Sequence, residues 1–111
     1  MAKNGGIPDF LNEVSDKIRE AQERVHNAHE GVAKHSKRDV SARHHLDTFK
    51  AGMLKIQGDP APLIAGHLKD LEQSAVNVAE DKQRAVHELT IAEKELADLT
   101  RARDQLKQMR S

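Results

Sequence analysis

The stretch Gly58-Asp59-Pro60-Ala61-Pro62 lies near the middle of the 111-residue chain and separates two arms of similar length. Gly58 suits the left-handed backbone conformation that ends a helix. Asp59 suits the cap of a following helix, with Pro60 at its first position, where the missing N–H of proline is not needed. This stretch therefore predicts a tight connection between two helices.

The arms on either side of this stretch contain no internal proline, which permits each to be one long helix. The sequence predicts a helix over 10–57, a turn over 58–60 and a second helix over 60–110. Residues 1–9 are rich in glycine and predict a flexible lead before a single helical domain over 10–111. A turn this short returns the chain in the antiparallel direction.

An apolar residue recurs every three or four positions along both arms, which is the pattern of a coiled-coil seam. In the first arm the repeat comprises Leu11, Val14, Ile18, Ala21, Val25, Ala28, Val32, His35, Asp39, Ala42, Leu46, Phe49, Met53 and Ile56. In the second arm it comprises Ile64, Leu68, Leu71, Ala75, Val78, Lys82, Ala85, Leu89, Ala92, Leu96, Leu99, Arg103 and Leu106. The predicted fold is all-α, a two-helix antiparallel coiled-coil hairpin, with dimerisation into a four-helix arrangement as an alternative.

Polar residues interrupt the two seams at matching heights. When the chain is folded at its turn, Asp39 of the first arm comes level with Lys82 of the second, and His35 lies one turn away. A buried charge is costly without a partner, and a buried pair often fixes the register of two helices. We therefore interpret His35, Asp39 and Lys82 as a structural polar layer rather than as an acid–base site.

The positions beside the seam are mostly basic in the first arm and mostly acidic in the second. An antiparallel hairpin pairs these flanks, whereas a parallel homodimer sets basic flanks against each other. The expected pairs are Arg38 with Asp81, Arg24 with Glu95, Lys50 with Glu72 and His29 with Glu93. The charge pattern thus favours pairing of the two arms within one chain.

Composition limits the classes of function. Charged residues make up 32% of the chain, aromatics only 2%, and there is no cysteine, so thiolate metal sites are excluded and little bulk remains for an enclosing core. The formal net charge is zero, which does not favour a dedicated nucleic-acid-binding protein. No apolar run suits a membrane span or signal peptide, so the sequence predicts a cytoplasmic protein without a cofactor.

Histidines and a basic segment suggest two further kinds of site. Seven histidines suggest metal binding, but His26 and His29 share a helix face without a second cluster opposite, so solvated side chains are the better interpretation. The segment 34–45 carries Lys34, Lys37, Arg38 and Arg43, which are candidates for phosphate contact. Because no aromatic residue is interleaved for base stacking, charge pairing within the hairpin is the preferred interpretation.

The remaining apolar residues suggest contact with another protein. Val40, Val76 and Val86 lie off the seam, and they are either scattered surface residues or part of a contact face. Asp59 and Pro60 at the turn are further candidates for contact. The predicted function is a non-catalytic protein–protein interaction module, such as an adaptor, chaperone, assembly factor or inhibitor of bacterial or phage origin, with a homodimer as one option. The alternative is a nucleic-acid-associated accessory protein that uses the 34–45 segment.

Overall fold

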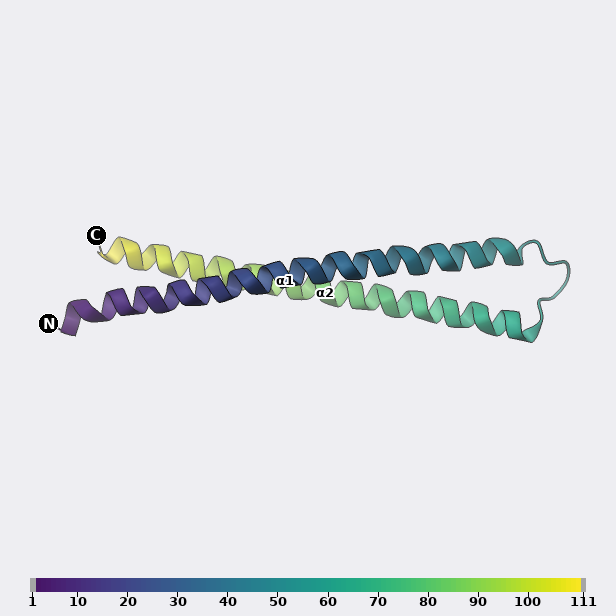
Figure 1. Cartoon of the computed structure of the whole chain (residues 1–111), viewed down its shortest axis with the longest axis horizontal. Helices are drawn as coiled ribbons and strands as arrows, with labels where there is room; N and C mark the ends of the chain where they lie inside the picture. Colours follow the sequence, from purple (N-terminus) through teal and green to yellow (C-terminus); the bar gives the residue numbers. More distant parts are fainter. Residues whose placement is uncertain (1, 111) are drawn as a thin grey trace. The chain divides into compact units, whose positions relative to one another are not determined.

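Two helices joined by one loop make up the chain. The structure, a computed structural model, describes residues 2–110 and the side chains of residues 9–109; Met1 and Ser111, the ends of the predicted lead and domain, lie outside the described residues. Helix α1 spans Ala2–Met53 and helix α2 spans Pro62–Arg110, and they run in opposite directions from the loop (Figure 1). The chain is therefore an all-α helical hairpin, as the sequence predicts.

Helix α1 begins earlier than the sequence predicts. Residues 2–9 are helical and continue directly into the rest of α1, so the predicted boundary at residue 10 is wrong. Once a helix has formed, each residue added at its end gains one backbone hydrogen bond for the conformational freedom that it loses. Extension from the stable segment therefore outweighs both the weak helix preference of Gly5 and Gly6 and the one backbone hydrogen bond that Pro8, which has no N–H, cannot donate.

The loop is longer than the predicted turn and covers residues 54–61. The last turn of α1 tightens, because the N–H of Lys55 donates to the carbonyl of Gly52 and the N–H of Ile56 donates to that of Met53, at 3.1 and 3.0 Å. Gly58 has a positive φ of 89°, the conformation for which glycine is suited, although it lies within the loop and not at the helix end.

Helix α2 begins at Pro62 and not at Pro60. The carbonyl of Ala61 accepts the first hydrogen bonds of the helix, from Ile64 at 2.9 Å and Ala65 at 3.0 Å, which makes Ala61 the cap. A residue that precedes proline is disfavoured in the helical conformation. Because Ala61 precedes Pro62, a helix that started at Pro60 would be interrupted one residue later.

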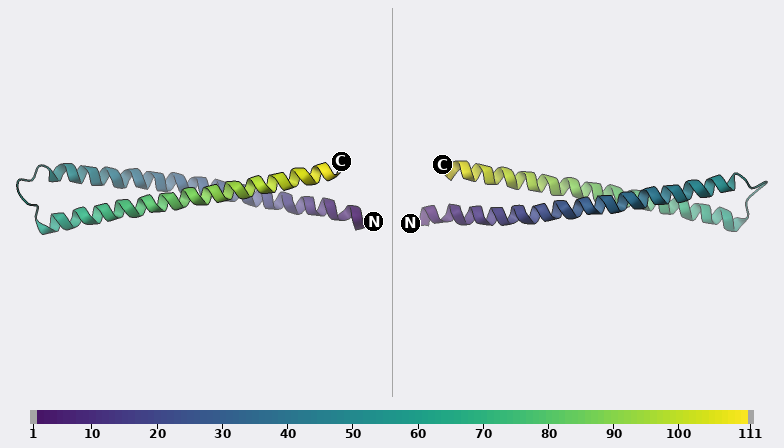
Figure 2. Two further views of the ribbon diagram at one scale, coloured as in Figure 1. Left: turned by 180° about the vertical axis from the view of Figure 1, so that it is seen from behind. Right: turned by 45° about the horizontal axis from the view of Figure 1, so that its top comes forward.

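The hairpin divides into two compact units. The terminal unit comprises residues 2–30 of α1 and 87–110 of α2, which run beside each other in opposite directions (Figure 2). Its core contains the most buried apolar side chains among residues 9–109, which are Leu11, Val14, Ile18, Ala21 and Ala92. The loop unit comprises residues 31–86, with the end of α1, the loop and the start of α2.

The predicted seam accounts for burial in both units. Every seam position of α1 from Leu11 to Met53, and every seam position of α2 from Ile64 to Leu106, is buried or half-buried. Ile56 is the exception, since it falls in the loop and is exposed. The 3–4 spacing therefore identified the inner face of each helix correctly.

Candidate functional site

A buried carboxylate occupies the seam of the loop unit. Only 7% of the Asp39 side chain is exposed, and Lys82 of α2 approaches its Oδ2 to 3.6 Å across the seam. Arg43, one turn along α1, donates to the same oxygen at 2.6 Å. The structure thus brings Asp39 and Lys82 together, as the seam register predicts, and adds Arg43 to the pair.

The third predicted member of the polar layer, His35, is placed differently. It is half-buried, and none of the described residues hydrogen-bonds to its buried Nδ1. His35 therefore lies in the seam one turn from Asp39 without joining the ion pairs. The spacing of Asp39 and Arg43, four residues apart on one helix, is the signal that identifies the actual third member.

The predicted pairs between the flanks are formed only in part. Arg24 and Glu95 approach to 3.3 Å in the terminal unit. Asp81 instead accepts a hydrogen bond from Arg84 on its own helix. Among the residues that the structure describes, the predicted partners of Asp81, Lys50 and His29 lie beyond ion-pair distance. For Asp81 the reason is an alternative partner one turn away on its own helix, since exposed ion pairs differ little in free energy.

The basic segment and the histidines remain on the surface. Lys34, Lys37 and Arg38 are exposed, whereas Arg43 is held against Asp39. His26 lies 3.1 Å from Glu30 on the same helix. Within the described residues no three histidine, aspartate or glutamate side chains gather as a metal site, and neither helix has an apolar stretch that would cross a bilayer.

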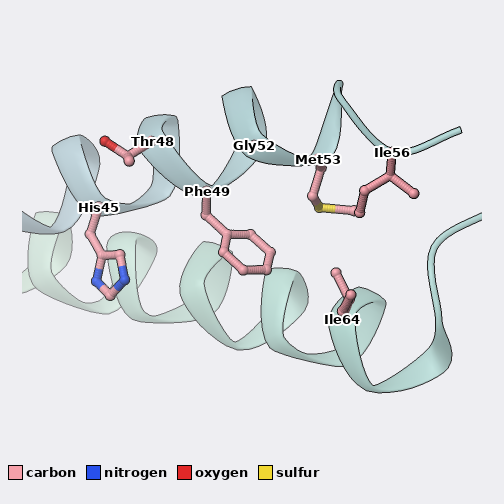
Figure 3. Close-up of a pocket in the computed structure, with 7 residues that line it drawn as sticks. All are labelled: His45, Thr48, Phe49, Gly52, Met53, Ile56 and Ile64. Atoms are coloured by element: carbon pink, nitrogen blue, oxygen red, sulfur yellow. The ribbon is translucent and has the colours of Figure 1, made fainter.

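An apolar groove lies beside the loop, between the end of α1 and the start of α2. It has a volume of about 340 Å³ and is lined by His45, Thr48, Phe49, Gly52, Met53, Ile56 and Ile64. The ring of Phe49 projects from α1 toward α2, and Met53 and Ile56 face Ile64 across the opening (Figure 3). Phe49 meets the ring of His67 edge to face, with centroids 4.9 Å apart. Packing of Phe49 against α2 therefore forms one side of the groove.

Two large apolar side chains flank the loop without packing inside it. Leu54 is 88% exposed and Leu63 is 85% exposed, and Ile56 is also exposed. Ile56 lines the groove, Leu54 follows Met53 of its lining, and Leu63 precedes Ile64 of its lining. Three large exposed aliphatic residues therefore occur within ten positions of the chain at this end of the loop unit. Leu54 and Leu63 are not among the contact residues that the sequence predicts, although their place outside the 3–4 repeat and beside the turn is a usable signal. We call these three exposed residues and the groove the loop-end surface.

The candidates for contact from the sequence fall in two places. Asp59 is exposed and Pro60 is half-buried, and both belong to the loop. Val40, Val76 and Val86 are exposed on the helices. Val86 lines a shallow groove with Asp39, Arg43, Ala79, Lys82 and Gln83.

Comparison with known protein families, with curated proteins and with solved structures finds no match to this chain.

Proposed function

We propose that this chain is a non-catalytic protein–protein interaction module, and that its loop-end surface receives an apolar segment of a partner protein. The observation that carries this proposal is the exposure of Leu54 and Leu63, which are the chain neighbours of Met53 and Ile64 in the lining of the groove. Exposed apolar area of this kind loses contact with water when a partner covers it, and a few such side chains supply most of the binding energy of an interface.

The charged groups of the loop unit support a structural role for its ion pairs. Asp39, the buried carboxylate, is neutralised by Arg43 and Lys82 instead of being presented to a substrate. The groove beside the loop has mostly apolar walls, with His45 and Thr48 at one end. These features suit binding of an apolar side chain better than proton transfer or nucleophilic attack.

The alternative, nucleic-acid contact through residues 34–45, has weaker support. One of its four candidates for phosphate contact, Arg43, already pairs with a carboxylate on its own helix. Three exposed cations, Lys34, Lys37 and Arg38, remain in a chain of zero net charge. Steep loss of binding with added salt would distinguish this alternative from apolar contact.

A charge-matched pair of variants tests the proposal. The variant Leu54→Glu with Leu63→Glu adds two negative charges to the loop-end surface, and Gln22→Glu with Gln105→Glu adds the same charge to exposed positions of the terminal unit. Each 111-residue chain serves as bait in a lysate of the cells that produce the protein. We expect the unchanged chain and the glutamine variant to retain the same proteins, and the leucine variant to lose them.

Circular dichroism provides the control for folding. Both variants change exposed side chains, so unfolding free energies should stay within about 0.5 kcal/mol of the unchanged chain. Retention of the same partners by a folded leucine variant would contradict the proposal. Recovery of DNA or RNA, released by moderate salt, would instead favour the alternative.

A further inference from the structure

A face of the loop unit separate from the loop-end surface carries three exposed valines, Val40, Val76 and Val86. Val86 and Ala79 of α2 and Arg43 of α1 line one shallow groove, which shows that these positions open on the same side of the helix pair. Val40 precedes Arg43 by three residues and Val76 precedes Ala79 by three, so helical spacing extends this side through both valines. We call this side the valine face.

The heights of the valines along the helices follow from the ion pair between Asp39 and Lys82. Val40 is one residue past Asp39, toward the loop. Helix α2 runs the opposite way, so its lower-numbered residues lie nearer the loop. The midpoint between Val76 and Val86 is position 81, which is one residue from Lys82 and also toward the loop. Val40 therefore lies level with that midpoint, and the other two valines lie about 7–8 Å above and below it at 1.5 Å per residue.

This spacing is symmetric, and symmetry is the requirement for a surface that binds a copy of itself. A two-fold axis that crosses both helices at the height of Val40 places a second copy over the first in the reversed direction. It sets Val40 opposite Val40 of the second copy, and Val76 opposite Val86 of the second copy. Gln83 then faces Ala79 of the second copy, and Arg43 lies level with Lys37 of the second copy, one residue from Ser36 of the second copy.

The distribution of charged side chains also favours a second copy of this chain as the partner of the valine face. Ser36 and Gln83 on this face are uncharged, and Arg43 is neutralised by Asp39. The charged Lys37 lies beside Val40 but, by helical spacing, on the side away from α2. The opposite flank carries Arg38 and Asp81, whose burial against a second copy would cost free energy. We therefore propose that the valine face binds a second copy of this chain in the antiparallel orientation, independently of the loop-end surface.

The first test uses the absence of cysteine from the sequence, because any thiol that is introduced is then unique. In Val40→Cys the two thiols meet near the axis, close to the separation of about 3.5–4.5 Å between Cβ atoms that a disulfide needs. We expect mild oxidation to convert Val40→Cys to a covalent dimer much faster than the control Lys34→Cys, an exposed residue elsewhere on α1. Equal rates for the two variants would overturn the proposal.

The second test concerns orientation. Val76→Cys and Val86→Cys should each form few dimers alone, whereas an equimolar mixture should form the mixed disulfide, because the axis pairs unlike positions. Faster dimerisation of either variant alone would overturn the antiparallel arrangement.

Light scattering on the unmodified chain completes the experiment. We expect the mass of a dimer at high chain concentration, and the mass of a monomer for Val40→Lys, in which like charges meet across the axis. Circular dichroism should show the same helicity for both. A monomeric mass for the unmodified chain at millimolar concentration would overturn the proposal, whereas loss of partners from the loop-end surface would not affect it.

Discussion

The terminal unit and the loop unit are built from the same two helices and the same repeat, yet they use apolar residues differently. In the terminal unit Leu11, Val14 and Ile18 are buried in the seam. The most buried seam residues of the loop unit are Asp39 and Ala85, and the larger apolar residues there are half-buried or lie outside the seam. The comparison indicates that the terminal unit contributes more to stability, whereas the loop unit leaves more apolar surface exposed, which is where we propose contact with other chains.

Truncating one isoleucine in each unit should give the largest difference between them. Ile18→Ala removes a side chain that is 4% exposed, and it should lower the unfolding free energy by about 3–4 kcal/mol. Ile64→Ala removes a half-buried side chain beside the groove and should cost about 1–2 kcal/mol. Urea denaturation followed by circular dichroism measures both, and equal losses would contradict the comparison.

The ion pair at the centre of the loop unit should contribute less than a buried apolar residue. Asp39→Ala leaves Lys82 and Arg43 without their shared carboxylate, but 36% of the Lys82 side chain is exposed and water replaces part of the interaction. We expect a loss of about 1.5–3 kcal/mol. Replacing both Asp39 and Lys82 by leucine should restore or raise the stability.

A double-mutant cycle of Asp39→Ala and Lys82→Ala isolates the pair. Coupling of at least about 0.5 kcal/mol is expected for side chains in contact. Additive effects would show that the two residues do not interact and that the register of the loop unit is wrong.

The glycines should give the smallest effects, and effects of opposite sign. Gly58 has a positive φ, so Gly58→Ala should destabilise the hairpin by about 1 kcal/mol. Gly31 lies within α1, and the space that an added methyl group would occupy is open, so Gly31→Ala should stabilise the hairpin by about 0.5–1 kcal/mol. Melting temperatures that shift in the same direction would contradict the backbone assignment at one of the two positions.

The seam and the antiparallel return could be predicted because both depend on spacing along the sequence. Burial of Asp39 opposite Lys82 follows from that spacing alone. The start of α2 differs from the prediction because the restriction that Pro62 imposes on Ala61 outweighs the capping preference of Asp59. That restriction is local and is therefore also readable from the sequence.

Side-chain partners were less predictable than burial. Asp81 pairs with Arg84 on its own helix and not with Arg38, because the free energies of alternative exposed ion pairs differ by less than about 1 kcal/mol. The groove beside the loop also depends on how Phe49 packs against His67, a detail that no periodic pattern contains. The proposed contact surfaces therefore required the structure, whereas the core did not.

Native-state hydrogen exchange is the most direct test of the division between a stabilising unit and a contact unit. It should be measured on Val40→Lys, so that self-association does not protect the loop unit. We predict slower exchange for amides of residues 14–21 and 92–99 than for those of residues 42–49 and 68–75, because opening the more deeply buried seam costs more free energy. Equal protection in both units, or slower exchange in the loop unit, would contradict the account.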